Sequence, residues 1–194
     1  TGLPFVTAKA GMSLDGRIAS FPGRRWITSE AARADAMKLR ASCDAILVGA
    51  ETVRVDDPHL TIRGVSKRRQ PWRVVWSRSG EIPREAKILT DEFRDRTLVF
   101  KGKSLLSVLR DLGRRGVQHV LIEGGGRTHG EAFDRGLVDR VVFYVAPVLL
   151  GGNTPAVGGR GKNKIKLANP LYKKVGADLR IEAEVLPKAR SGGR

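Results

Sequence analysis

The chain has 194 residues, enough for one domain with a sizeable core, and 41% hydrophobic with 29% charged residues is typical of a soluble globular protein. No apolar run approaches the ~20 residues that cross a bilayer, and a single cysteine, Cys43, excludes a disulfide framework and a multi-cysteine zinc site. We therefore predict no membrane span and no metal site, and the net charge of +16 favours anionic ligands.

The basic residues occur in local runs that do not alternate with aromatic residues. Aromatics make up only 6% of the chain, so a stacking platform for nucleic acid is not expected. A scattered basic surface suits small phosphorylated ligands equally well, because it steers them toward a cleft. For any single run, solvated surface charge is the commonest explanation. The N-terminus lacks the charged start and apolar segment of a signal peptide, so a cytoplasmic location is the default expectation.

The first half of the chain alternates strand and helix patterns. The apolar residues at 5–12 predict a strand, within which Lys9 is either an edge residue or part of a site. A cap at Thr28 or Ser29 predicts a helix that continues to about Ser42. Further strands are expected at 45–48, 72–77 and 97–100.

Two neighbouring carboxylates, Asp56 and Asp57, follow the second expected strand. Neighbouring side chains point in different directions, so the two do not share a proton. Asp57 precedes Pro58 and is most simply a turn residue, which leaves Asp56 freer to be functional.

The clearest helix is predicted over 104–115, where leucine and valine recur at i, i+3, i+4 and i+7. A short strand at 120–122 then runs into Glu123, the glycines at 124–126 and a helix over 128–135. This layout suits a phosphate cradle, although it is neither GxGxxG nor a P-loop, and a tight strand-to-helix turn is about equally favoured. Glu123 favours function, because a carboxylate beside an anion cradle must face another ligand.

The C-terminal part is predicted to close the sheet. We expect a strand at 137–145, a mobile glycine-rich surface loop at 151–163, and a hairpin formed by 164–174 and 178–186. Residues 1–186 then form one α/β domain with a mostly parallel sheet flanked by helices, and 187–194 form a basic, disordered tail.

Five motifs occur in one order along nearly the whole chain. They are AKAGMSLDGRIA (8–19), RWITSEAARAD (25–35), LRASCDAILVGAETVRVDDPHLTIR (39–63), VLIEGGGRTHGEAF (120–133) and LVDRVVFYVAPVLLGG (137–152). In this ordered set the chain resembles the reductase domain of riboflavin biosynthesis, which is fused behind a deaminase in many bacteria and stands alone in archaea and fungi. Each motif alone is weak, whereas the ordered set is specific.

The resemblance implies a dihydrofolate-reductase-like fold, NADPH as cofactor and usually a homodimer. The implied reaction reduces the ribosyl group of a phosphorylated pyrimidine substrate, a phosphoribosylamino-pyrimidine, to a ribityl group. Hydride from the nicotinamide adds to C1′ of the opened sugar, and the protein orients both partners and manages one proton. The deaminase itself is not in this chain, which lacks His-x-Glu with Pro-Cys-x-x-Cys, so a deaminase partner is expected to be fused or separate.

Carried over residue by residue, the resemblance assigns NADPH contacts to Met12, Trp26, Thr52, Asp56, Ser77, Gly125, Gly126, Arg127, Thr128, His129, Gly130 and Glu131. It assigns substrate contacts to Arg24, Arg40, Leu60, Arg63 and Glu123. Arg40 and Arg63 suit a clamp on the 5′-phosphate, and Glu123 suits pyrimidine N–H groups. Lys9 and Asp56 are the candidates for polarising the opened sugar and relaying a proton.

Plainer readings exist for single residues: Arg40 as a helix-surface charge, Trp26 as core and Lys9 as an edge residue. The chain also departs from the family, which typically has a small polar residue at position 24, and smaller residues than Arg127 and His129.

Several alternatives stay open at this stage. The chain is also compatible with a relative that reduces another substrate such as a pterin, with a basic nucleic-acid-binding module, or with a silent homologue that serves as a scaffold. Thr1 is not an initiator Met, and 1–6 resembles the stretch where the reductase begins in fused enzymes, so a fragment of a bifunctional enzyme is a further expectation. The sequence does not choose between the diaminopyrimidinone and amino-uracil substrates, and it leaves hydride stereochemistry and oligomeric state open.

Overall fold

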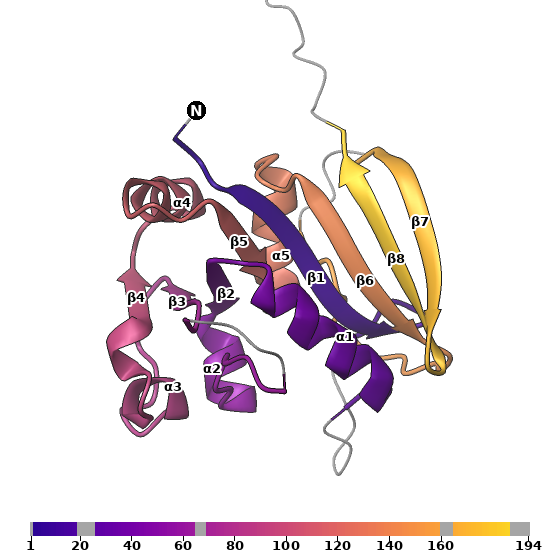
Figure 1. Cartoon of the computed structure of the whole chain (residues 1–194), viewed down its shortest axis with the longest axis horizontal. Coiled ribbons are helices and arrows are strands. Elements are labelled where there is room, and N and C mark those ends of the chain that lie inside the picture. Colours follow the sequence, from indigo (N-terminus) through magenta and orange to yellow (C-terminus); the bar gives the residue numbers. More distant parts are fainter. Residues whose placement is uncertain (1, 19–25, 65–68, 160–164, 187–194) are drawn as a thin grey trace, which may run out of the picture.

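The computed structural model describes residues 2–18, 26–64, 69–159 and 165–186 (Figure 1). Arg24, part of the glycine-rich segment and the tail at 187–194 lie outside these ranges. What the sequence predicts for them therefore stays a prediction.

One sheet organises the described chain. Its strands are β1 (Phe5–Ser13), β2 (Ala45–Gly49), β3 (Trp72–Ser77), β4 (Thr97–Lys101), β5 (His119–Ile122), β6 (Arg140–Ala146), β7 (Leu167–Val175) and β8 (Asp178–Val185). They lie in the order β4-β3-β2-β5-β1-β6-β8-β7. Every pair from β4 to β6 is parallel, whereas β8 runs antiparallel to both β6 and β7. The predicted mostly parallel sheet with a closing hairpin is confirmed.

Helices cover both faces of this sheet. They are α1 (Glu30–Ala41), α2 (Ala50–Asp56), α3 (Lys87–Thr90), the 3-10 turn η1 (Arg94–Arg96), α4 (Leu105–Arg114) and α5 (Gly126–Asp134). Along β2, Ala45 and Leu47 pack with α4 and α5, whereas Ile46 and Val48 pack with α2 and α3. The helix α1 covers β6 through Ala32 and Ala36. Burial on both faces explains why these strands read as continuous apolar runs.

Local signals start and stop the elements where the sequence places them. The Ser29 side chain caps α1 by accepting from the Ala32 N–H at 3.3 Å, and Ser104 caps α4 by accepting from the Ser107 N–H at 3.2 Å. Gly176, with φ of 62°, turns the β7–β8 hairpin. No helix among the described residues combines the length and apolar character that crossing a bilayer demands.

Two element starts differ from the prediction, and two short elements were not predicted. The helix α5 begins at Gly126 rather than at 128, and β6 begins at Arg140 rather than at 137. Leu137 is apolar because it closes α5, where its N–H donates to the Ala132 carbonyl at 2.9 Å, and not because it lies in a strand. The short elements α3 and η1 were not predicted, since neither is long enough to show a period.

Candidate active site

A buried cluster of three charges lies where β1 and β5 meet the end of α1. The Arg40 guanidinium donates from Nε and Nη2 to the two Glu123 carboxylate oxygens, both at 2.7 Å. Lys9 Nζ lies 3.9 Å from Glu123 Oε2. The side chains of Lys9, Arg40 and Glu123 are only 18%, 13% and 5% exposed. Because β1 lies between β5 and β6, Lys9 is not an edge residue. Because its side chain is only 13% exposed, Arg40 is not a surface charge.

The cluster carries one positive charge in excess. Burial acts to raise the pKa of Glu123, but the Arg40 and Lys9 charges outweigh it and lower that pKa to about 2. Burial lowers the pKa of Lys9 below its usual value; Glu123 opposes this effect, and Arg40 adds to it. Glu123 is therefore held ionised, while Lys9 is poised to release a proton more readily than an exposed lysine.

Arg40 also ties the cluster to the loop at 57–63, which follows α2. Its Nη1 donates to the Thr61 carbonyl at 3.0 Å, two residues before the exposed Arg63. The same loop contains Asp57 and Leu60, whose φ values of 39° and 51° are rare for residues other than glycine. A backbone of this kind persists only where its surroundings hold it.

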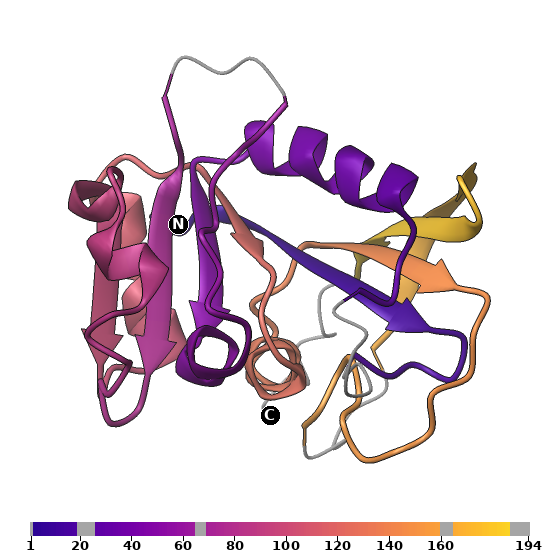
Figure 2. The ribbon, with the colours of Figure 1, turned by 90° about the horizontal axis from the view of Figure 1, so that it is seen from below.

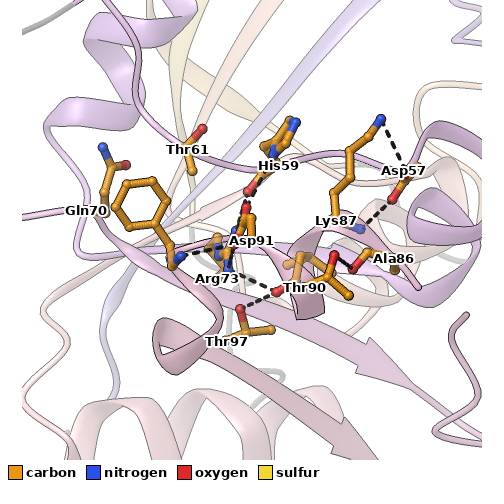
Figure 3. Close-up of polar contacts among 12 residues, drawn as sticks. Asp57, His59, Thr61, Gln70, Arg73, Ala86, Lys87, Thr90, Asp91 and Thr97 are labelled. Carbon is orange, nitrogen blue, oxygen red and sulfur yellow. Dashed lines mark hydrogen bonds and ion pairs between the residues drawn. The ribbon is translucent and has the colours of Figure 1, made fainter. Parts of the chain in front are cut away.

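A network beneath the loop at 57–63 supplies that support (Figure 3). Asp57 Oδ1 accepts from the Lys87 N–H at 2.9 Å, and the Gln70 side-chain amide pairs with both N–H and C=O of Ile62 at 2.8 and 3.1 Å. Arg73 Nη1 donates to the His59 carbonyl at 2.9 Å. The loop is thus held at three points along its length.

Arg73 is the centre of this network. Its side chain is fully buried and makes two 2.7 Å hydrogen bonds to the two Asp91 carboxylate oxygens. Its Nη2 also donates to the Ile88 carbonyl at 2.9 Å. Leu60, expected to contact substrate, instead packs its side chain into the apolar cluster of α2 and α3, and its substrate contact stays a prediction.

The glycine turn after β5 is tight for steric reasons. A Cβ at Gly124 would lie 2.7 Å from Val48 Cα, and one at Gly126 would lie 2.1 Å from the Pro155 carbonyl oxygen. At Gly130 a Cβ would overlap the Gly158 carbonyl. Gly125 is different: its φ is 59°, and a Cβ there would meet only Thr52 Oγ1, at 3.4 Å. Packing therefore accounts for three of the glycines, and backbone conformation for Gly125.

Gly125 is the N-cap of α5 and makes no side-chain hydrogen bond. The first-turn N–H groups of a helix have no partner within the helix, and they attract anions. Thr52 of α2 lies beside this turn, and Figure 2 shows α2 and α5 next to each other, both seen nearly along their axes. The turn is tight, and it presents a helix N-terminus; the phosphate cradle stays a prediction.

Other residues expected to contact the cofactor follow the carboxyl ends of strands. Met12 is half-buried near the end of β1, and Ser77 ends β3 with its hydroxyl accepting from the Gly80 N–H at 2.9 Å. Asp56 ends α2 with an exposed side chain. Trp26 is 56% exposed beneath the Arg33 guanidinium, so it is not core. In open α/β sheets, ligands bind outside this edge.

Within α5 the expected cofactor residues separate into two groups. Thr128 is buried beside Gly49, and the His129 imidazole is buried with its ring nitrogens 2.9 Å from the Ala156 carbonyl and 3.2 Å from the Ile122 carbonyl. Burial lowers the pKa of His129. By contrast, Arg127 is exposed, and Glu131 pairs with Arg135 one turn along the helix. The side chain of His129 therefore joins α5 to the Ala156 segment.

Sequence reasoning missed Arg73, Asp91 and Gln70. The available signal was an arginine inside the apolar run WRVVW, comparable to Lys9 inside FVTAKAGM. Among the described residues, no three His, Cys, Asp or Glu side chains gather as a metal site requires.

Fold and site together define an α/β protein with a cationic cluster near the carboxyl ends of parallel strands, where this class binds nucleotides. The chain belongs to the RibD C-terminal domain family, whose pattern matches residues 4–180. The resemblance to the reductase domain of riboflavin biosynthesis, and the dihydrofolate-reductase-like fold it implies, are confirmed.

Individual relatives agree. The riboflavin biosynthesis protein RibD of Mycobacterium tuberculosis (strain ATCC 25618 / H37Rv) is 44% identical over 187 residues, which cover 92% of this chain and 54% of that protein. The structure of Acinetobacter baumannii RibD, form 2, superimposes with a TM-score of 0.82 at 30% identity, covering 96% of this chain and 59% of that one.

A third relative carries two activities in its name. It is a diaminohydroxyphosphoribosylaminopyrimidine deaminase/5-amino-6-(5-phosphoribosylamino)uracil reductase from Thermotoga maritima, with a TM-score of 0.76 at 28% identity. The match covers 95% of this chain and 57% of that one. The chain thus spans a little over half the length of these relatives.

Proposed function

We propose that the chain is an NADPH-dependent reductase that converts the ribosyl group of a phosphoribosylamino-pyrimidine to a ribityl group, in the cytoplasm and as a step of riboflavin biosynthesis. The observation that carries the proposal is the buried Lys9–Glu123–Arg40 cluster, in a domain of the RibD C-terminal family. A deaminase, fused or separate, is the expected partner activity.

The residues around the glycine turn fit a dinucleotide. Gly125 has space where a Cβ would stand, the N-terminus of α5 favours negative charge, and Thr52 adds a hydroxyl beside it. Met12 and Ser77 follow the same edge of the sheet. When bound there, NADPH supplies the hydride. NADPH is expected to bind in preference to NADH because the protein is strongly basic, and a titration with both cofactors at moderate salt tests this.

Lys9 is the best-placed proton donor. Reduction of the opened sugar adds a hydride to C1′ and a proton to the attached nitrogen, so the C1′=N double bond becomes a single bond. The ammonium of Lys9, with its pKa lowered by burial, gives up that proton and is reprotonated by solvent. Glu123, held ionised, accepts hydrogen bonds from pyrimidine N–H groups while Arg40 fixes its orientation. Asp56, exposed at the end of α2, is the alternative proton relay.

The substrate phosphate is assigned to Arg63 with a share of Arg40. Arg40 uses three N–H donors on Glu123 and Thr61, and a guanidinium has five donors. Arg63 is exposed and follows the anchored loop directly. The loop at 57–63 thus ends with Arg63, and Arg40 holds it through the Thr61 carbonyl.

The homodimer is proposed to form through β7. This strand lies at the edge of the sheet and exposes Leu167, Leu171 and Tyr172, which is an apolar surface beside unpaired backbone groups. Sedimentation of wild type and of Tyr172→Lys tests it: a wild-type dimer that dissociates in the variant supports this face, and a wild-type monomer overturns it.

The decisive experiment follows NADPH oxidation at about 340 nm with each candidate pyrimidine. We expect turnover with the phosphorylated amino-uracil or diaminopyrimidinone and much weaker turnover after removal of the phosphate. Efficient reduction of a pterin that lacks phosphate, with none of either pyrimidine, contradicts the proposal.

A further inference from the structure

A cleft lies at the amino ends of three parallel strands of the sheet. Its volume is about 230 Å³, and it is lined where β2, β3 and β4 begin. We call it the arginine cleft and define it by Arg69, Trp72, Arg96, Arg115 and Asp44. Lys9 lies within β1 and Glu123 follows β5, so neither belongs to the strands that line the cleft. Gln70 lies between the two sites: it lines the cleft, and its side-chain amide holds Ile62 of the loop at 57–63.

Positive charge dominates the arginine cleft. Its carboxylate, Asp44, already accepts from the backbone N–H groups of Gln118 and His119 at 3.0 and 2.9 Å. Arg115 pairs with Asp111 at 2.7 Å. Within the described ranges, no carboxylate forms an ion pair with Arg69 or Arg96. Two guanidinium groups thus face the cleft without a counter-charge.

Arg96 has a fixed orientation but an incomplete set of hydrogen bonds among the described residues. Its guanidinium carbon lies 4.5 Å from the centre of the Trp72 ring, a cation–π contact that fixes its direction. Its Nε is buried and lacks a hydrogen-bond partner among the described residues. Burial, and then the charge of Arg69, lowers the pKa of Arg96, so the two like charges lie close enough to repel. An anion between them supplies both the missing acceptor and the missing charge.

We propose that the arginine cleft binds the phosphate group of a small phosphate ester, between Arg69 and Arg96. The volume is below the ~300–1,000 Å³ of pockets for drug-sized ligands, so it suits a sugar phosphate better than a dinucleotide. A nucleic acid fits less well, since its backbone needs a continuous basic track and stacking aromatics. The inference rests on Arg69 and Arg96, neither of which is assigned to the active site, so it does not depend on the reductase activity.

The test compares ribose 5-phosphate with ribose by calorimetric titration, in saturating NADPH so that the cofactor site is filled. Ribose 5-phosphate is expected to bind and ribose is not. Arg96→Gln and Arg69→Gln should each weaken binding about tenfold or more, since each removes a charge-assisted hydrogen bond. Arg110→Gln, exposed on α4, loses the same charge elsewhere and should bind like wild type. Arg63→Gln is measured as well, because it reports any ribose 5-phosphate held at the substrate-phosphate site proposed above.

The outcomes separate the alternatives. If Arg63→Gln loses binding and Arg96→Gln does not, ribose 5-phosphate occupies the active site and the proposal is wrong. Equal weakening in all four variants shows non-specific attraction and also overturns it. A short single-stranded RNA tested in parallel overturns it if Arg96→Gln weakens only the RNA. If urea unfolding shows that Arg96→Gln is destabilised, Arg69→Gln decides alone, because Arg69 is exposed.

Discussion

Two buried ion pairs in this molecule have nearly the same geometry and different surroundings. Arg40 with Glu123 and Arg73 with Asp91 each form two parallel 2.7 Å hydrogen bonds. In the Arg73–Asp91 pair the charges balance, and Nη1 and Nη2 of Arg73 also donate to the carbonyls of His59 and Ile88, while the buried Nε has no hydrogen-bond partner among the described residues. In the Arg40–Glu123 pair a third charge, Lys9, shares the carboxylate.

The difference separates a structural ion pair from a binding site. We call the Arg73–Asp91 pair the latch, because it holds the loop at 57–63. A balanced pair carries no excess charge to attract a ligand, and Arg73 acts by holding the loop at 57–63. An unbalanced cluster keeps an excess positive charge out of water, which is costly unless a ligand uses it. Bidentate geometry alone therefore does not indicate function, whereas charge imbalance at a strand end does.

The largest effect is expected when the excess positive charge of the cluster is removed. Lys9→Met leaves a balanced Arg40–Glu123 pair, and turnover should fall about 10²–10⁴-fold because the proton donor is gone. Stability should stay level or rise, since a buried excess charge is removed. Turnover by NADPH oxidation and urea unfolding check the two halves. Lys38→Met, exposed on α1, is the control and should match wild type in both. Full turnover in Lys9→Met contradicts the assignment.

Breaking the latch comes next. Arg73→Met removes two hydrogen bonds to Asp91, which keeps, among the described residues, only the His59 imidazole and the Phe93 N–H as partners, and frees two carbonyls, so the free energy of unfolding should fall by about 3–5 kcal/mol. Urea denaturation measures it, and Arg78→Met, exposed just beyond the end of the same strand, should change stability by less than about 0.5 kcal/mol. In any Arg73→Met protein that folds, KM for the pyrimidine should rise more than kcat falls, because the loop at 57–63 is loosened. Equal stability of the two variants would refute the latch.

Lowering the pH should destabilise the protein by protonating Glu123. Its pKa in the folded state is about 2, below the ordinary 4.5, so its contribution is full above pH 4.5 and is lost as pH falls toward 2. The difference between 4.5 and about 2 corresponds to about 3 kcal/mol. Urea midpoints at a series of pH values should therefore fall more steeply below pH 4.5 in wild type than in Glu123→Gln. Parallel curves for the two proteins rule out the ionised, paired Glu123.

The smallest effect is expected at Arg63, the exposed last residue of the loop at 57–63. Arg63→Ala should weaken pyrimidine binding about ten- to a hundredfold by removing a charge-assisted hydrogen bond to phosphate, with NADPH binding nearly unchanged. Dephosphorylated substrate provides the control within a double-mutant cycle. Wild type should lose affinity on dephosphorylation, and Arg63→Ala should lose much less. Equal losses mean that Arg63 does not touch the phosphate.

The sequence by itself determined the elements and their order. Apolar runs marked the strands, Ser29 and Ser104 marked the helix starts, and Gly176 marked the hairpin, because each signal acts over a few residues. It also singled out Glu123 as a carboxylate that needs a partner. The ordered motifs indicated the family without any knowledge of the fold.

Only the tertiary structure decided which charges meet. Glu123 reaches Lys9 because β5 lies between β2 and β1 in the sheet, a strand order that no local pattern reports. Arg73 finds Asp91 and the His59 carbonyl across three separate segments, and Gly126 is required by a chain segment almost thirty residues further on. Hydrophobic periodicity states which face a side chain takes, whereas its partner depends on long-range strand order and packing. The balance of charge that distinguishes the site from the latch is therefore a property of the fold.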